Sequence, residues 1–130
     1  MNIKQLLVLG ASALASPLCG PAVAQETQAQ YVQVAEIDID LAQLEDYKAA
    51  VREQIEAAIK IEPGVLVLYA VAENDNPTRV RVFEIYRDMD AYRSHLETAH
   101  FKKYKATTET MVRSLNLVRT TPIMLGAKAR

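Results

Sequence analysis

The sequence predicts an α+β fold in which two helices cover one face of a four-stranded antiparallel sheet. Strand-length segments rich in β-branched residues are interspersed with two segments in which apolar residues recur at helical spacing. Their order along the chain is strand, helix, strand, strand, helix, strand. Such a split β-α-β arrangement folds as one antiparallel sheet with both helices on the same side.

The first strand and the first helix are predicted from the start of this pattern. Tyr31–Ile39 is rich in β-branched residues and is expected to be a strand. Asp40 follows as an N-cap, with Gln43 three residues later in a capping-box arrangement. Apolar residues then recur at helical spacing, at Leu41, Leu44, Val51, Ile55, Ala58 and Ile59. This spacing predicts an amphipathic helix of about 20 residues, which Glu62-Pro63-Gly64 ends.

The next two strands are expected to form a hairpin. Val65–Ala72 is an almost unbroken apolar run, and its length and flanking turn residues predict a strand buried on both faces. Residues 74–77 have turn chemistry. Residues 78–86 alternate between polar and apolar positions, with Arg79 and Arg81 set against valines, and predict the partner strand.

A second helix and a last strand complete the domain. Asp88 or Asp90 is the expected N-cap, and the helical pattern continues, with a kink near His100, to Met111. Its apolar and aromatic face comprises Tyr92, His95, Leu96, Ala99, Phe101 and Tyr104. Residues 115–120 predict the last strand. We therefore expect one ferredoxin-like domain over residues 31–122 and a tail over residues 123–130.

The N-terminal segment, residues 1–24, has the three parts of a cleavable export signal. Lys4 supplies a positive charge, residues 6–18 carry no charge, and Ala22-Val23-Ala24 offers small residues for a cut after Ala24. The uncharged stretch is shorter than the roughly 20 residues that span a membrane. We expect a periplasmic or secreted protein with no membrane contact after cleavage.

Cleavage would also change the chemistry that the chain can support. Cys19, the only cysteine, would be lost, and Leu18 before it argues against a lipidated cysteine. The loss excludes disulfides, thiol catalysis and thiolate metal sites. Without Lys4, the 15 basic residues become 14 against 16 acidic ones, a net charge of −2. This balance offers no footprint for nucleic acid and favours a small organic partner.

The predicted sheet face opposite the helices also carries apolar residues. The run Val65–Ala72 has few polar positions to point at water. A bare apolar sheet face on a small domain indicates an interaction surface. We expect a homodimer in which two sheets meet face to face in a shared barrel.

Four short motifs follow one another along the domain. They are Glu62-Pro63-Gly64 at the helix–strand junction, Phe-Glu-Ile-Tyr-Arg-Asp at 83–88, Ala-Tyr-Arg-Ser-His-Leu at 91–96 and Ala-His-Phe-Lys at 99–102. In this order and spacing the sequence resembles the antibiotic biosynthesis monooxygenase (ABM) family, including its quinol monooxygenase branch. The resemblance covers nearly all of residues 31–122. It implies a dimeric ferredoxin-like α+β barrel with a pocket between sheet and helices.

The resemblance also implies a chemistry. Several family members oxidise phenolic, quinol or anthrone-like substrates with molecular oxygen and without metal or flavin, whereas others isomerise small metabolites or degrade haem. The haem-degrading branch uses a Trp where this chain has His95 and a ligand His near the position of Lys105, and this chain contains no Trp. This departure argues against haem degradation, and no cofactor is expected.

His95 is the candidate catalytic base. Cofactor-free oxygenation needs a base to remove a phenolic proton, and an unperturbed imidazole, with a pKa of about 6.5, suits that role. Tyr92 and Ala99 share its helix face, and the resemblance implies that it faces the pocket. The alternative is a histidine that packs at a dimer edge. His100 is turned about 140° away on a continuous helix, so we expect no shared pocket and no metal site.

Four further residues are candidates for substrate binding. Tyr69 and Tyr86 can reach the pocket from neighbouring strands, and Tyr92 from the helix; the alternative is that the strand tyrosines are core residues with a wet tip. Glu84 lies mid-strand among apolar residues, where an inward carboxylate would have a raised pKa. The alternative, an ion pair of Glu84 with Arg79 or Arg81 across the sheet or across the dimer, is the favoured one.

Three functional hypotheses follow. The leading one is an exported, dimeric, cofactor-independent monooxygenase-like enzyme acting on a small aromatic or quinol substrate. The second is a non-catalytic or stress-related dimer whose pocket holds a small apolar ligand. The third is an isomerase of a small carbonyl metabolite.

Overall fold

The computed structural model describes residues 15–17, 20 and 29–130 of the chain. The expected cut after Ala24 and the position of Cys19 lie outside the described residues. Among the described residues, no helix is both long enough and apolar enough to cross a membrane.

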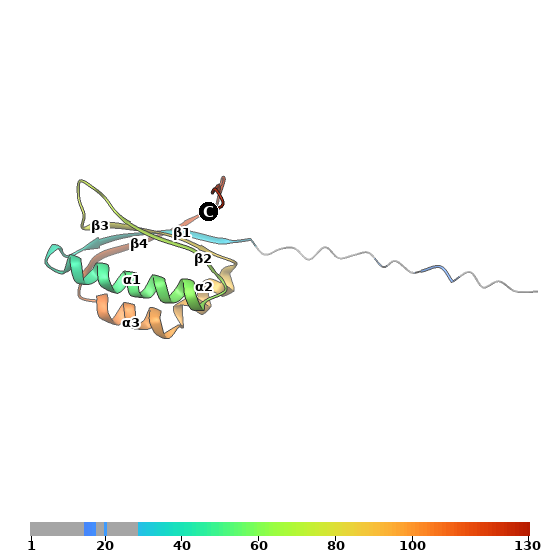
Figure 1. The fold of residues 1–130 in the computed structure, drawn as a ribbon, viewed down its shortest axis with the longest axis horizontal. Helices are drawn as coiled ribbons and strands as arrows, with labels where there is room; N and C mark the ends of the chain where they lie inside the picture. The colour runs from blue at the N-terminus through green and yellow to red at the C-terminus, as the bar shows by residue number, and fades with distance from the viewer. Residues whose placement is uncertain (1–14, 18–19, 21–28) are drawn as a thin grey trace, which may run out of the picture.

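A four-stranded sheet forms one layer of the domain and the helices form the other (Figure 1). The strands are β1 (Tyr31–Ile39), β2 (Val65–Ala72), β3 (Arg79–Tyr86) and β4 (Val112–Thr120). They are ordered β2-β3-β1-β4, and every neighbouring pair is antiparallel. The predicted ferredoxin-like topology is therefore confirmed. Within one chain the sheet stays open, with β2 and β4 at its two edges, and does not close into a barrel.

The first helical segment agrees with the prediction. A 3-10 turn, η1 (Leu41–Gln43), leads into α1 (Leu44–Ile61). Asp40 is the N-cap, and its carboxylate accepts a hydrogen bond from the Ala42 backbone N–H at 3.4 Å. Gln43 also donates to this carboxylate, at 3.2 Å.

The second helical segment differs from the prediction because it consists of two helices. They are α2 (Met89–Leu96), which is capped by Asp88, and α3 (Ala99–Thr108). Thr98 separates them: its hydroxyl accepts from the Phe101 backbone N–H at 3.3 Å and donates to the His95 carbonyl at 2.7 Å. The interruption therefore lies just before His100, and α3 ends at Thr108 rather than Met111.

The core lies between the sheet and the helices. Alternate residues of the two central strands point toward the helices, among them Ala35 and Ile37 of β1 and Val80 and Val82 of β3. They pack against the buried side chains of α1, including the fully buried Tyr47. A second buried cluster, at the other end of the sheet, comprises Tyr31, Ala58, Val65, Leu68, Tyr86 and Ala91.

The prediction that β2 is buried on both faces is wrong for the single chain. The apolar run does form the strand, but β2 lies at a sheet edge. Val65 and Leu68 are buried, whereas Tyr69 and Val71 are 61% and 59% exposed. Alternate side chains of a strand point to opposite faces, and the helices cover only one of them.

Gly64 lies where the α1–β2 turn approaches α2 most closely. A Cβ atom at this position would lie 2.5 Å from the Cβ of Ala91. The Gly64 carbonyl also accepts a hydrogen bond from the Arg87 backbone N–H at 2.8 Å, which holds the turn in place. Glycine is required here because of this contact rather than an unusual backbone angle, since no described glycine has a positive φ.

We expect Gly64→Ala to lower the free energy of unfolding by about 1–3 kcal/mol, because the added methyl group overpacks this contact. Urea unfolding of the purified protein measures the change. The matched background is Ala91→Gly, which removes the facing methyl group. In the Ala91→Gly protein, Gly64→Ala should lower the free energy of unfolding by clearly less. An equal loss of stability in the native and the Ala91→Gly proteins would refute the steric explanation.

Candidate functional site

A cavity of about 290 Å³ lies between the helix-side face of the sheet and the helices. Most of its wall is apolar, with Ile37, Val82 and Leu117 from the sheet and Phe101 from α3. The polar groups in the wall are Gln33, Gln54, Glu84, Tyr86, Tyr92, His95, Tyr104 and Lys105. A largely apolar hollow with a few convergent polar groups is the usual form of a small-molecule site.

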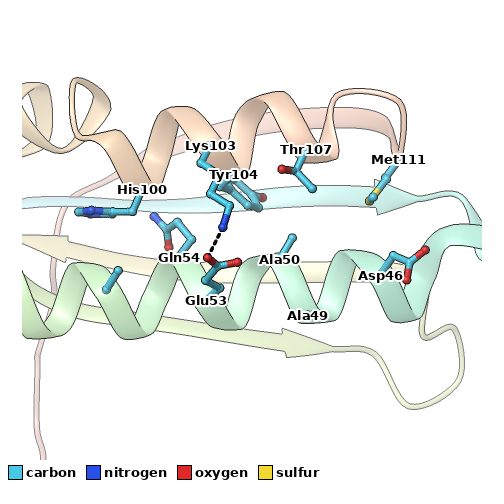
Figure 2. Close-up of a pocket in the computed structure, with 11 residues that line it drawn as sticks. Asp46, Ala49, Ala50, Glu53, Gln54, His100, Lys103, Tyr104, Thr107 and Met111 are labelled. Atoms are coloured by element: carbon cyan, nitrogen blue, oxygen red, sulfur yellow. Dashed lines mark hydrogen bonds and ion pairs between the residues drawn. The ribbon is translucent and has the colours of Figure 1, made fainter.

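A second hollow, of about 400 Å³, runs between α1 and α3 (Figure 2). It shares Gln54 and Tyr104 with the cavity, and the ion pair between Glu53 and Lys103 crosses it. Its remaining wall includes the small side chains of Ala49, Ala50 and Ala57. We take the cavity under the sheet as the candidate site because buried titratable groups converge there.

Glu84 is the carboxylate of this cavity. It faces the helices because it occupies the same alternate positions of β3 as Val80 and Val82. Its Oε2 atom accepts hydrogen bonds from Gln33 Nε2 at 2.7 Å and from the Tyr86 hydroxyl at 2.9 Å. Burial raises the pKa of Glu84 above the ordinary carboxyl value, although the two hydrogen bonds act in the opposite direction.

The expected pairing of Glu84 with Arg79 or Arg81 is wrong within the single chain. Arg79 and Arg81 both lie within ion-pair distance of Glu73, at 3.8 Å and 3.1 Å. They occupy the odd-numbered positions of β3, so their side chains leave the sheet on the face away from Glu84. The structure instead shows the other arrangement considered for Glu84, in which its carboxylate points inward, toward the helices.

Tyr86 and Tyr92, which both line the cavity, belong to an aromatic group with Tyr31. The Tyr92 ring stacks on Tyr31 with 4.2 Å between centroids and meets the Tyr86 ring edge-on at 5.2 Å. Tyr86 is 1% exposed. Its burial, together with the negative charge of Glu84, raises the pKa of Tyr86 far above its ordinary value. Tyr86 therefore remains a hydrogen-bond donor to Glu84.

Tyr69 does not join the other predicted residues in the cavity. Its side chain projects from β2 at an odd-numbered position, on the sheet face away from the helices. The sequence pattern could not decide between the two faces, because both neighbours of Tyr69 are also apolar.

His95 lies in the cavity wall and is 2% exposed. Its Nδ1 atom is 2.8 Å from Glu62 Oε2, and its Nε2 atom is 3.0 Å from Gln54 Nε2. Both ring nitrogens are therefore engaged by the protein. Glu84, in contrast, uses only Oε2 in its two hydrogen bonds and has Oε1 left for a bound molecule. The geometry favours Glu84 over His95 as the group that meets a substrate proton.

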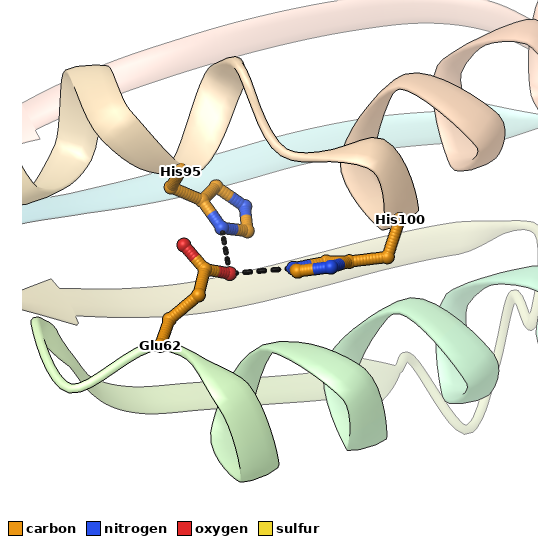
Figure 3. A group of neighbouring side chains, drawn as sticks. All are labelled: Glu62, His95 and His100. Atoms are coloured by element: carbon orange, nitrogen blue, oxygen red, sulfur yellow. Dashed lines mark hydrogen bonds and ion pairs between the residues drawn. The ribbon is translucent and has the colours of Figure 1, made fainter.

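Glu62 is the residue of this region for which the sequence indicated no chemical role. Its Oε2 atom contacts both His95 Nδ1 and His100 Nε2, the latter at 2.6 Å (Figure 3). The expected separation of the two histidines assumed a continuous helix. Because the helix is interrupted at Thr98, their ring centroids lie 6.2 Å apart. His100 itself lines the hollow between α1 and α3 rather than the cavity.

The raised pKa of Glu84 predicts how its replacement changes stability with pH. Between the ordinary carboxyl pKa of 4.5 and the raised value, folded Glu84 holds a proton that the unfolded chain has released. Native stability should therefore fall as pH rises through this window, and Glu84→Gln should gain stability relative to the native protein as the pH rises above 4.5. Urea unfolding at several pH values measures the difference.

Asp88→Asn is the control for this pH series. The Ala91 backbone N–H lowers the pKa of Asp88, so its stabilising effect is present above the ordinary pKa of 3.8 and is lost at lower pH. Asp88→Asn should accordingly gain stability relative to the native protein as the pH falls below 3.8, whereas Glu84→Gln gains it as the pH rises above 4.5. A pH-independent difference for Glu84→Gln would contradict the raised pKa.

The comparisons with known proteins agree with this architecture. Residues 30–107 match the family model described as "Antibiotic biosynthesis monooxygenase". A crystal structure from Bacteroides thetaiotaomicron, assigned to the antibiotic biosynthesis monooxygenases, is 48% identical with a TM-score of 0.74, over 78% of this chain and 96% of that chain. No curated protein matches.

Two further solved structures are more distant. One from Nitrosomonas europaea, with the same assignment, is 25% identical with a TM-score of 0.69, over 72% of this chain and 90% of that chain. One from Lactobacillus acidophilus, assigned as a monooxygenase, is 26% identical with a TM-score of 0.68; the match covers 72% of this chain but only 46% of that chain. The fold, the matched residues and the Bacteroides relative together show that this chain belongs to the antibiotic biosynthesis monooxygenase family.

Proposed function

We propose that this protein is an oxygenase that binds a small phenolic or quinol-type aromatic substrate in the cavity under its sheet, with Glu84 accepting the substrate's phenolic proton. The observation that carries the proposal is the inward Glu84 carboxylate, which neutral donors hold inside a largely apolar cavity. Membership of the ABM family supports the reaction class.

The cavity supplies what such a substrate needs. Tyr92 and Phe101 offer aromatic surfaces against which a planar ring can pack. A phenolic hydroxyl directed at Glu84 Oε1 can lose its proton there, while Gln33 and Tyr86 keep Oε2 fixed. A carboxylate with a raised pKa is a better proton acceptor than an ordinary one.

The chemistry after deprotonation needs no further reductant. In a hydroquinone the electrons pass to molecular oxygen, one ring C–H becomes C–OH, and the two original hydroxyl hydrogens leave with the second oxygen atom as water. In an anthrone-type substrate the electron-rich anion passes electrons to molecular oxygen, and a ring CH₂ group becomes a C=O group. One oxygen atom enters the product and the other leaves as water, which takes up the two hydrogens of the CH₂ group. The proton held by Glu84 returns to the product oxygen. The apolar wall limits access of water to the intermediates.

We also propose that two copies of the chain pair through the sheet face opposite the helices. This outer face carries exposed apolar side chains, namely Tyr69 at 61%, Val71 at 59%, Val118 at 38% and Phe83 at 37% exposure. They lie on β2, β3 and β4, so the apolar surface reaches from one edge strand of the sheet to the other. Such a surface on a small domain favours association, and a second copy offers a matching surface.

We further propose that the protein is exported from the cytoplasm before it acts. This proposal rests on the sequence of residues 1–24 alone. An exported protein has no ready supply of reduced nicotinamide, so a reaction in which the substrate supplies all the electrons suits that location.

Oxygen uptake with a panel of hydroquinones and anthrones tests the proposed reaction. We expect uptake above the protein-free rate for at least one compound, and a loss of about 100-fold or more in Glu84→Gln, the usual contribution of a positioned base. His95→Gln should retain far more activity, because its ring nitrogens already contact Glu62 and Gln54. Glu53→Gln serves as the surface control, because Glu53 is exposed and pairs with Lys103 across the hollow between α1 and α3.

Three outcomes decide between the hypotheses. Uptake equal to the protein-free rate across the panel, with tight binding of a panel compound, would replace the enzyme by a ligand-binding protein. Normal uptake in Glu84→Gln combined with loss in His95→Gln would return the role of base to His95. A loss in Glu53→Gln would indicate a non-specific effect of substitution.

The dimer is tested by sedimentation velocity. We expect the native protein to sediment as a dimer and Phe83→Asp as a monomer, because a charge in the middle of the outer face would have to be desolvated on pairing. Ile59→Asp on α1, where the side chain is 52% exposed, should leave the dimer intact. A native monomer at micromolar concentration would refute the pairing.

A further inference from the structure

The three side chains around Glu62 come from three different helical segments. Glu62 is the C-cap residue of α1, His95 lies in the last turn of α2, and His100 lies in the first turn of α3. Their ligand atoms, one carboxylate oxygen and two imidazole nitrogens, all lie within 4.8 Å of one another. Figure 3 shows both imidazoles directed at the same carboxylate oxygen.

The charge of Glu62 lacks a permanent partner. Its side chain is only 9% exposed, and its ion-pair partners within the described part of the chain are His95 and His100. A histidine carries a positive charge only when it is protonated. Glu62 also lies at the C-terminal end of α1, where the helix dipole favours cations over anions. A buried carboxylate in such surroundings is stabilised by a bound cation.

We propose that Glu62, His95 and His100 form a binding site for a divalent first-row transition metal ion, with Zn²⁺ as the reference ion. Two imidazole nitrogens and one carboxylate oxygen are the donor set of many zinc sites, whereas magnesium and calcium prefer oxygen donors alone. Three protein ligands leave a fourth position for water. His100, whose side chain is 15% exposed, lies on the side from which the ion can enter.

The present distances are compatible with binding after a small adjustment. Oε2 of Glu62 is 2.8 Å from His95 Nδ1 and 2.6 Å from His100 Nε2, which are hydrogen-bond distances. Around a tetrahedral zinc ion, with metal–ligand bonds of about 2.0–2.1 Å, neighbouring ligand atoms are separated by roughly 3.3 Å. The Glu62 carboxylate therefore has to withdraw by about half an ångström, and the two imidazole nitrogens, which lie within 4.8 Å of each other, have to come to the same separation.

Gln54 can support the metal-bound form of His95. Once Nδ1 binds a metal, the imidazole hydrogen resides on Nε2, which lies 3.0 Å from the Gln54 amide. A Gln amide offers both a donor and an acceptor, so a rotated Gln54 can accept that hydrogen through its oxygen. Metal-bound histidines commonly have such a partner at the second nitrogen.

The proposed ion would link α1, α2 and α3 on the far side of His95 from Gln54. It does not depend on the proposed oxygenation, because Glu84 belongs to a separate hydrogen-bonded group with Gln33 and Tyr86. Metal binding and oxygen uptake can therefore be measured independently.

Isothermal titration with Zn²⁺, and visible absorption during titration with Co²⁺, test the site on the full chain. All variants carry Cys19→Ser so that a thiolate cannot contribute. We expect one ion per chain and a cobalt spectrum typical of tetrahedral nitrogen and oxygen ligands. Glu62→Gln and His100→Gln should each weaken binding by about 100-fold or more, since even the loss of a supporting residue costs 10- to 100-fold.

Glu53→Gln is the matched control, because Glu53 lies on the same helix and pairs with Lys103 rather than a histidine. It should bind Zn²⁺ with unchanged affinity. Circular dichroism of each metal-free variant establishes that it is folded; if one ligand variant fails to fold, the other decides. The absence of one-to-one binding at micromolar protein, or equal affinity in the native protein and a folded ligand variant, would overturn the proposal.

Discussion

The interruption of the second helical segment at Thr98 is the feature on which both proposed sites depend. Its hydroxyl caps α3 at Phe101 and donates to the His95 carbonyl, so the chain changes direction after Leu96. A continuous helix would turn His100 about 140° away from His95. With the interruption, both imidazoles reach the carboxylate of Glu62, and the Phe101 ring lies against His95 with 4.8 Å between centroids. One capping residue thus shapes the cavity wall and assembles the cluster behind it.

Two carboxylates lie near His95, and their surroundings suit them to different tasks. Glu84 is held in the cavity by the neutral donors Gln33 and Tyr86, and burial raises its pKa. Glu62 contacts imidazoles at the C-terminal end of a helix, where a cation is favoured. Among the described residues, no buried side-chain polar atom lacks a hydrogen-bond partner. The buried polar groups between the sheet and the helices therefore form hydrogen-bonded networks. These networks hold the side chains in the geometry that a reaction or a bound ion requires.

Local sequence patterns were sufficient for the first three strands and for α1, whereas β4 begins at Val112, three residues before the predicted start at Leu115. The bounds of Tyr31–Ile39 and Val65–Ala72 follow from runs of β-branched and apolar residues between turn signals, and Asp40 caps as predicted. The prediction that Val65–Ala72 is buried on both faces was wrong for the single chain, because apolar character alone does not distinguish a central strand from an edge strand. The two-helix form of the segment after Asp88 was only partly predicted, because the cap at Thr98 involves a single hydroxyl within an otherwise helical pattern.

The sequence by itself determined the ferredoxin-like fold and the membership of the ABM family, because both are carried by periodicity and by short motifs in a set order. It also identified His95, Tyr86, Tyr92 and Glu84 as residues that the cavity brings together. Only the tertiary structure decided which of them has a free atom for a substrate, which face Tyr69 occupies and what Glu62 contacts. The physical reason is separation along the chain: Gln33 and Glu84 lie 51 residues apart, and Glu62 lies 33 and 38 residues from its two histidines. Contacts over such distances are set by the packing of helices on the sheet, which no local pattern encodes.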